Sequence, residues 1–158
     1  MFQVVRSGTG TAPVVRYLTS TGAFVRGEPL IYDTGLVKVA GADPTAIVGV
    51  SMQAYETAPG YNQANSPTVN TGRASKVSVA IATREAVFRG KMTNGSATRV
   101  AAAVTDIGVS YGITAYSSVW TVDKNKTSSD VRVKVVGFDD LTGDAFFKFL
   151  EAAITPNP

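Results

Sequence analysis

The chain has 158 residues, a formal net charge of +3, and neither cysteine nor histidine. The absence of both residue types excludes disulfides, thiolate nucleophiles, Ser-His-Asp and Cys-His catalysis and His-ligated zinc. Because histidine is the usual acid–base group at neutral pH, we expect no enzymatic activity, no cofactor and no metal site. Charged residues are 17% of the chain, below a norm of about 25%, which favours a β-protein with a hydroxyl-rich surface.

Residues 1–13 are predicted to form an N-terminal arm ahead of a single domain, residues 14–158. The short apolar segment 2–5 precedes RSGTGTAP, whose alternate glycines with Ser, Thr and Pro favour a flexible connector. Segment 2–5 is either the first strand of the domain or a strand that pairs with a partner's sheet edge. In the second case the candidate contact residues are Phe2, Val4 and Arg6.

Residues 27–52 contain three short apolar segments that are separated by the turn sequences DTG and GADP. Short β-branched segments between such turns predict a meander of antiparallel strands. The third segment is expected to have one apolar side and one side of smaller residues that permits close packing. The two expected sides are Val48, Val50 and Met52 on the first and Ile47, Gly49 and Ser51 on the second.

Residues 54–72 form a long uncharged segment rich in Asn, Pro and Gly, apart from one glutamate. Such a long loop in a compact domain is typically either functional or mobile. Tyr55 and Tyr61 are candidate contact residues, since tyrosine combines apolar area with a polar tip. The alternative is that this loop folds back over the domain and buries them.

Further strands are predicted from alternation of apolar and polar residues. They span residues 14–18, 23–25, 75–83, 85–92, 119–122, 131–138 and 145–150. Residues 97–104 have the composition of a helix but are short. Trp120 is interpreted as a core residue rather than as a platform for sugars. With roughly ten short strands, the chain is predicted to be all-β: a small antiparallel β-barrel or sandwich with long loops, the N-terminal arm and at most one short helix.

The charges are unevenly distributed along the chain. Residues 73–99 carry six cations against one acid, whereas the segment from Asp139 onward is acidic. Arg84, Arg89 and Lys91 are candidates for contact with an acidic protein surface; alternatively, these strand residues simply face water.

Three aspartates surround one turn, at Asp139, Asp140 and Asp144. They could bind calcium, but their spacing does not fit an EF-hand loop, and an acidic turn between two strands explains them. No pair of carboxylates has a context that indicates acid–base chemistry.

Six short segments of the sequence can be considered together: GEPL at 27–30, GLV at 35–37, ADPTAIVGV at 42–50, DIGVSYGI at 106–113, WTVD at 120–123, and the pairing of 133–139 with FKFL at 147–150. These segments resemble the head decoration, or cement, proteins of tailed bacteriophages. This resemblance implies a β-rich protein on the outside of the capsid, trimeric, which braces neighbouring major capsid subunits. The corresponding location is the outer surface of the virion, after synthesis in the host cytoplasm.

The alternative function is a carbohydrate- or receptor-binding β-module that uses Tyr55, Tyr61 and Trp120. Under the first function the partners are the major capsid protein and two further copies of the chain, with no direct contact to nucleic acid or membrane. The sequence has no apolar leader at its N-terminus and no segment near the roughly 20 apolar residues that a membrane span needs.

Overall fold

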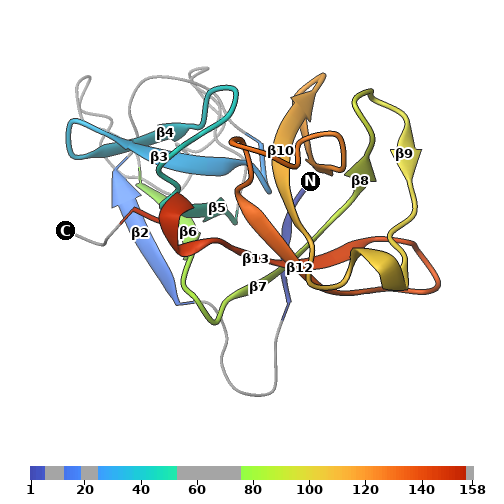
Figure 1. Cartoon of the computed structure of the whole chain (residues 1–158). Helices are drawn as coiled ribbons and strands as arrows, with labels where there is room; N and C mark the ends of the chain where they lie inside the picture. Colours follow the sequence, from blue (N-terminus) through green and yellow to red (C-terminus); the bar gives the residue numbers. More distant parts are fainter. Residues whose placement is uncertain (6–12, 19–24, 53–75, 156–158) are drawn as a thin grey trace.

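The computed structural model describes residues 1–5, 13–18, 25–52 and 76–155. Their strands form two sheets (Figure 1). The eight-stranded sheet has the order β1-β7-β13-β12-β10-β11-β8-β9, and the five-stranded sheet has the order β2-β6-β5-β3-β4. The predicted all-β class is confirmed: the described part has no helix of seven or more residues, and neither sheet closes into a barrel.

The five-stranded sheet is built from the first half of the chain. Its strands are β2 (Val14–Leu18), β3 (Pro29–Asp33), β4 (Leu36–Val39), β5 (Gly49–Ser51) and β6 (Lys76–Ile81). The eight-stranded sheet takes β1 from the N-terminus and the other strands from the second half. Its strands are β1 (Gln3–Val5), β7 (Val87–Gly90), β8 (Met92–Thr93), β9 (Arg99–Val100), β10 (Ser110–Tyr116), β11 (Val119–Asp123), β12 (Val133–Phe138) and β13 (Ala145–Phe149).

Two single-turn 3-10 helices complete the described structure, η1 (Val104–Asp106) and η2 (Glu151–Ala153). The strand ladders are antiparallel, as predicted, with the exception that β8 runs parallel to β11. A further parallel bridge joins Ile47 to Ile154 just after η2. This bridge ties the segment that follows β13 and η2 to the segment just before β5 of the five-stranded sheet.

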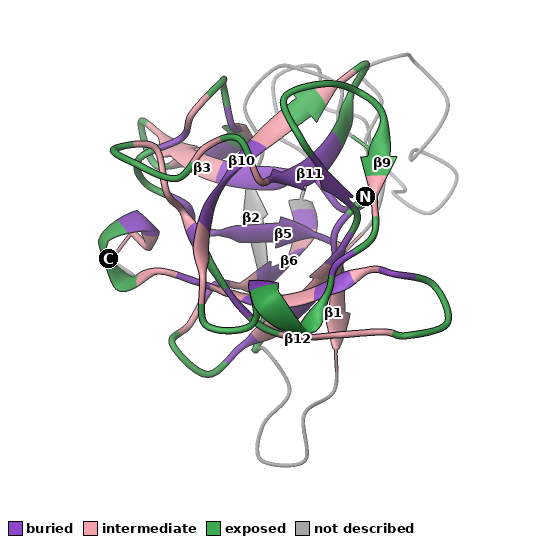
Figure 2. Cartoon of the chain, turned by 45° about the vertical axis from the view of Figure 1, so that its right-hand side comes forward, coloured by how far each residue is buried: buried purple, intermediate pink, exposed green. Residues whose placement is uncertain are grey.

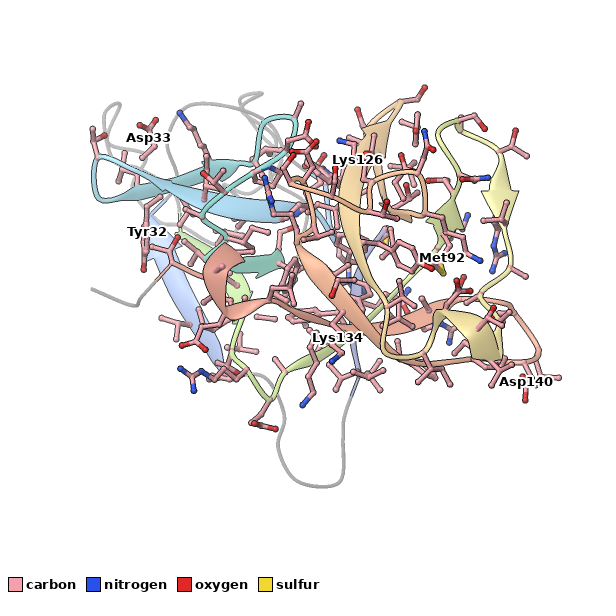
Figure 3. All side chains as sticks on the ribbon, viewed as in Figure 1. Tyr32, Asp33, Met92, Lys126, Lys134 and Asp140 are labelled. Carbon is pink, nitrogen blue, oxygen red and sulfur yellow. The ribbon has the colours of Figure 1, made fainter. Side chains whose placement is uncertain are left out.

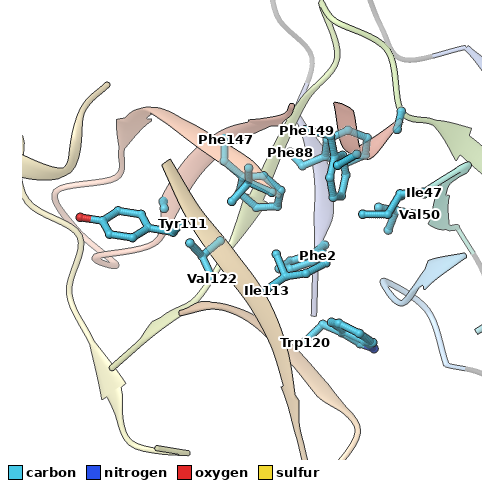
Figure 4. Packing of buried hydrophobic residues seen from close by; sticks show 14 of the residues in the cluster. Phe2, Ile47, Val50, Phe88, Tyr111, Ile113, Trp120, Val122, Phe147 and Phe149 are labelled. Carbon is cyan, nitrogen blue, oxygen red and sulfur yellow. The ribbon is translucent and has the colours of Figure 1, made fainter. Parts of the chain in front are cut away.

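The larger core, which we call cluster 1, lies between the two sheets. It contains the aromatic residues Phe2, Phe88, Phe147, Phe149, Tyr111 and Trp120, with aliphatic residues from both sheets (Figure 4). The ring centroids of Phe2 and Phe147 are 4.9 Å apart in an edge-to-face arrangement, which adds to the stabilisation from burial alone. Burial at the centre of the molecule is clear in Figure 2, where β5 is buried along its whole length.

The five-stranded sheet has a second core, cluster 2, on its other face. Cluster 2 consists of Leu30, Val37, Val48, Val77 and Val79. The edge strands β2 and β4 lie against each other without pairing, so the sheet is strongly curved. We attribute the burial of cluster 2 in part to this curvature.

The two faces of β6 follow the predicted alternation. Val77 and Val79 belong to cluster 2, whereas Ala80 belongs to cluster 1. At β5 the expected arrangement is wrong in one respect: Val48 belongs to cluster 2 and Val50 to cluster 1, so they do not share a side. The regular pleat starts only at Gly49, after the isolated bridge at position 47.

The expected close packing at the small residues of this segment is found at Gly49. A Cβ atom there would overlap the carbonyl oxygen of Ala80 on the neighbouring strand β6. Only glycine permits the two backbones to approach this closely.

The N-terminal segment is part of the domain and not an arm, at least for residues 1–5. β1 pairs with β7 in register Gln3 to Arg89, and the Phe2 side chain is 1% exposed in cluster 1. The prediction of Phe2 as a contact residue is therefore wrong, because its ring contributes to the protein's own core.

Two further expectations differ from the structure. Residues 97–104 do not form an α-helix: they contain β9, which pairs with β8, and the first residue of η1. Of the predicted strand 23–25, Val25 lies in no strand, and 23–24 fall outside the described residues.

Candidate partner-binding surface

The candidate contact residues occupy very different environments. Arg6, Tyr55 and Tyr61 lie outside the described residues. Val4 is partly buried and packs against cluster 1, on the same inner side as its cross-strand partner Phe88. Of this strand, the residues that point outward are therefore Gln3 and Val5.

The basic segment pairs with the acidic C-terminal segment of the same chain. Arg84 bonds to Glu151, and both side chains are largely exposed. The Arg89 guanidinium lies 2.8 Å from Asp144 and 3.2 Å from Asp139, with Thr142 Oγ1 2.9 Å from its Nη2. The charges of Arg84 and Arg89 are thus neutralised within the molecule. Arg84 and Arg89 already have acidic partners and are weak candidates for an external one.

Lys91 is exposed between β7 and β8. In the described part of the chain it has no carboxylate within ion-pair distance. Of the three basic candidates, Lys91 alone has no acidic partner among the residues that the structure describes.

The turn between β12 and β13 is an acidic turn held by its own hydrogen bonds. Asp139 accepts the backbone N–H groups of Leu141 and Thr142 at 3.0 and 3.3 Å. Its hydrogen bond with the Thr142 side chain, these N–H groups and the nearby Arg89 lower the pKa of Asp139. Asp144 also pairs with Arg99 at 2.5 Å. Among the described residues no three acidic side chains are grouped as metal ligands.

The outward side of the eight-stranded sheet forms a continuous face over β1, β7, β13 and β12. Residues that are cross-strand partners share a face, which identifies its members. We call this set the outer face; it consists of Gln3, Val5, Val87, Arg89, Lys134, Val136, Gly137, Phe146 and Lys148.

The centre of the outer face is apolar. Val5 and Val87 are paired on neighbouring strands and are half-buried, and Phe146 is half-buried beside Gly137. Val136 is 41% exposed at an irregularity where the β12–β13 register shifts. An apolar centre with a charged rim is the typical composition of a protein–protein contact.

Two acidic side chains of this half of the chain, Asp106 and Asp123, are buried, and their carboxylates accept several hydrogen bonds. Asp106 is 3% exposed; it accepts Tyr111 Oη at 2.8 Å and pairs with Lys124 Nζ at 2.7 Å. Burial alone would raise the pKa of Asp106, but the hydrogen bonds from Lys124, the Ala103 N–H and Tyr111 outweigh it and lower the pKa. Burial and the bond to Asp106 raise the pKa of Tyr111 to about 12, so this phenol stays protonated at neutral pH.

Asp123 has a similar environment between β10 and the loop after β8. It accepts the N–H groups of Gly95 and Asn125 at 2.8 and 3.0 Å and the Tyr116 hydroxyl at 3.0 Å. Burial would raise the pKa of Asp123, but these hydrogen bonds outweigh it and lower the pKa. Asp106 and Asp123 therefore stabilise the β10–β11 hairpin as ionised, bonded groups, and they are not presented to solvent.

Trp120 is 3% exposed in cluster 1, which confirms its interpretation as a core residue. It cannot serve as an exposed platform for sugar rings while it is buried there.

The sequence did not identify Val136, Phe146, Lys134 and Lys148 as surface candidates. Alternation correctly places Lys134 on the polar side of β12, opposite the buried Val133 and Val135. Alternation places Val136 on this side as well, but the register shift beside it has no local sequence signal.

Comparison of the chain with family models, curated proteins and solved structures finds no match in any of the three. No helix in the described part of the chain is long and apolar enough to cross a membrane.

Proposed function

We propose that this protein is a virion structural protein that decorates the outside of a phage capsid as a trimer and stabilises the lattice of the major capsid protein. The observation that carries the proposal is the outer face, which has the half-buried Val87 and Phe146 and the exposed Val136 near its centre. The resemblance of several short sequence segments to phage head decoration proteins supports the same function.

The mechanical properties of the fold suit such a role. Cluster 1 joins both sheets, and ion pairs connect the strands at the rim of the outer face. A rigid face loses little conformational entropy on binding, so its contact area is used efficiently. Many copies on one lattice would add their weak contacts through avidity.

The test uses heads that lack this protein, purified from the phage that encodes it. The oligomeric state of the protein is measured by sedimentation, its binding by co-sedimentation with heads, and head stability by calorimetry. We expect a stable trimer that binds expanded heads and raises their melting temperature. A monomer that leaves the melting temperature of the heads unchanged would exclude the proposed function.

The carbohydrate-binding alternative has less support, since Trp120 is buried. A glycan array tests it directly, and specific binding to one glycan class would favour it over capsid decoration.

A further inference from the structure

Two lysines of the outer face lie directly opposite each other. Lys134 on β12 and Lys148 on β13 are cross-strand partners, and such partners on one face have Cβ atoms about 4.5–5.5 Å apart. Like charges in this position destabilise a sheet. In the view of Figure 3, Lys134 lies below β12.

Little within the chain compensates this repulsion. Lys148 Nζ lies 3.2 Å from Glu85, but the Glu85 side chain is 83% exposed, so water weakens the pair. In the part of the chain that the structure describes, no carboxylate lies within 4.0 Å of Lys134. By contrast, Arg84, Arg89 and Arg99 of the same region each have an acidic partner.

The lysine pair adjoins the apolar centre of the outer face. Val136 follows Lys134 on the same side of β12, and Phe146 precedes Lys148 on the same side of β13. A partner that covers this region must supply apolar atoms for Val136 and Phe146 and negative charge for the two amines.

We infer that the Lys134–Lys148 pair receives a carboxylate of a protein partner, with Val136 and Phe146 packing against apolar side chains beside it. This inference rests on the proposed function, in which that partner is the outer surface of the major capsid protein. A nucleic acid fits less well: its phosphates would meet Glu85, Asp139 and Asp144 around the face, and its backbone offers no apolar surface to Phe146.

The charge reversal Lys134→Glu gives two opposite effects. It places a carboxylate opposite Lys148, so the variant should unfold at a higher temperature than the wild type. The same change repels the carboxylate of the partner, so head binding should weaken at least tenfold. A purely structural role of Lys134 cannot produce this combination, because it would move stability and binding together.

The matched control is Lys38→Glu. Lys38 is an exposed strand lysine on the five-stranded sheet, where it pairs with Asp33 at 3.2 Å. This variant has the same change in net charge, and it should lose some stability and bind heads as the wild type does. Equal weakening by Lys38→Glu and Lys134→Glu would show that only net charge matters and would overturn the inference.

Carbodiimide cross-linking provides the second measurement. The reagent joins lysine amines directly to carboxylates, and mass spectrometry of decorated heads then identifies both residues. We expect links from Lys134 and Lys148 to carboxylates of the major capsid protein. Links only from other lysines, links from Lys134 to a second copy without heads, or Lys134-dependent binding of a DNA duplex would each overturn the inference.

Capsid decoration and partner binding by the lysine pair are tested separately. If the wild type binds heads and Lys134→Glu binds equally well, the inference fails and capsid decoration stands. If the wild type does not bind heads, capsid decoration and the inference fail together.

Discussion

Glu28 is a buried acid in a small ring of hydrogen bonds at the start of β3. The Val25 N–H donates to Glu28 Oε2 at 2.8 Å, and Ser51 Oγ donates to the Val25 carbonyl oxygen at 2.7 Å. Ser51 Oγ in turn accepts the Glu28 N–H at 3.1 Å. Burial raises the pKa of Glu28, although the bond from Val25 opposes this shift. Unlike Asp106 and Asp123, the Glu28 side chain is therefore favoured in its protonated, neutral form in the folded protein.

We expect Glu28→Gln to stabilise the protein at neutral pH. A raised pKa in the folded state means that the stability contributed by Glu28 is fully present below its unfolded pKa and is lost as the pH rises through its folded pKa. Glutamine keeps an oxygen for the Val25 N–H and carries no charge. The measurement is the free energy of unfolding of both proteins in urea between pH 3.5 and 7.5.

The informative quantity is the difference between variant and wild type, because other carboxylates titrate equally in both. It should grow in favour of the variant as the pH rises and then level off. A constant difference, or one that favours the wild type at neutral pH, would contradict the raised pKa of Glu28.

The β10–β11 hairpin closes through a turn with an unusual composition. Ser117 and Ser118 both have positive φ, 48° and 64°, between the paired residues Tyr116 and Val119. Such two-residue turns strongly prefer Asn-Gly, since the left-handed conformation costs other residues about 1–2 kcal/mol each. The hairpin therefore stores backbone strain at an exposed tip.

The double substitution Ser117→Asn and Ser118→Gly should stabilise the protein by about 1 kcal/mol, which raises the melting temperature of a chain this long by roughly 2–4 °C. Gly35→Ser is the matched control in the β3–β4 turn, where Gly35 has φ 83° and nothing lies within 4 Å of an added Cβ. It should lower the stability by about 1 kcal/mol. An unchanged or lower melting temperature of the double variant would show that this turn is not strained.

Strands with clean alternation could be predicted from sequence, and β6 and β12 are the clearest cases. In β12 buried and exposed residues follow period two because one side faces a core, and in β6 alternate residues belong to the two different cores. Residues 97–104 could not be predicted in the same way. Their alanines favour a helix, but pairing of Val100 with Met92 and the hydrogen bond from the Ala102 N–H to the Gly143 carbonyl oxygen hold the chain extended.

The outer face was even harder to predict from the sequence. Its members come from strands that are distant along the chain, and their neighbours depend on sheet order, which non-local packing decides. Segment 2–5 illustrates the difficulty. If the inward side of this strand is assigned with an error of one residue, Phe2 and Val4 are placed on the surface in place of Gln3 and Val5.

At the scale of the whole molecule, the two sheets behave as one unit because they share cluster 1. Ile47 is a key connection: it is fully buried, belongs to cluster 1 and forms the parallel bridge to Ile154. Its N–H donates to the Ala153 carbonyl oxygen at 2.7 Å, and the Thr155 N–H donates to the Ile47 carbonyl oxygen at 3.0 Å.

Ile47→Ala should destabilise the whole protein by about 2–5 kcal/mol, the usual range for truncating a buried isoleucine. Val37→Ala is the comparison in cluster 2, where Val37 is likewise fully buried. Both variants should unfold in one calorimetric transition with coincident fluorescence and circular dichroism signals. Two separate transitions in either variant would show that the sheets unfold independently.

The position of β13 has a consequence for how the protein is made. This strand is the last of the described strands, yet it lies between β7 and β12 in the interior of its sheet. Until residues 145–149 leave the ribosome, β7 and β12 lack a common neighbour and expose strand edges on which chains can aggregate. The eight-stranded sheet is therefore completed only after all its other strands have been made, and it is most exposed to aggregation before then.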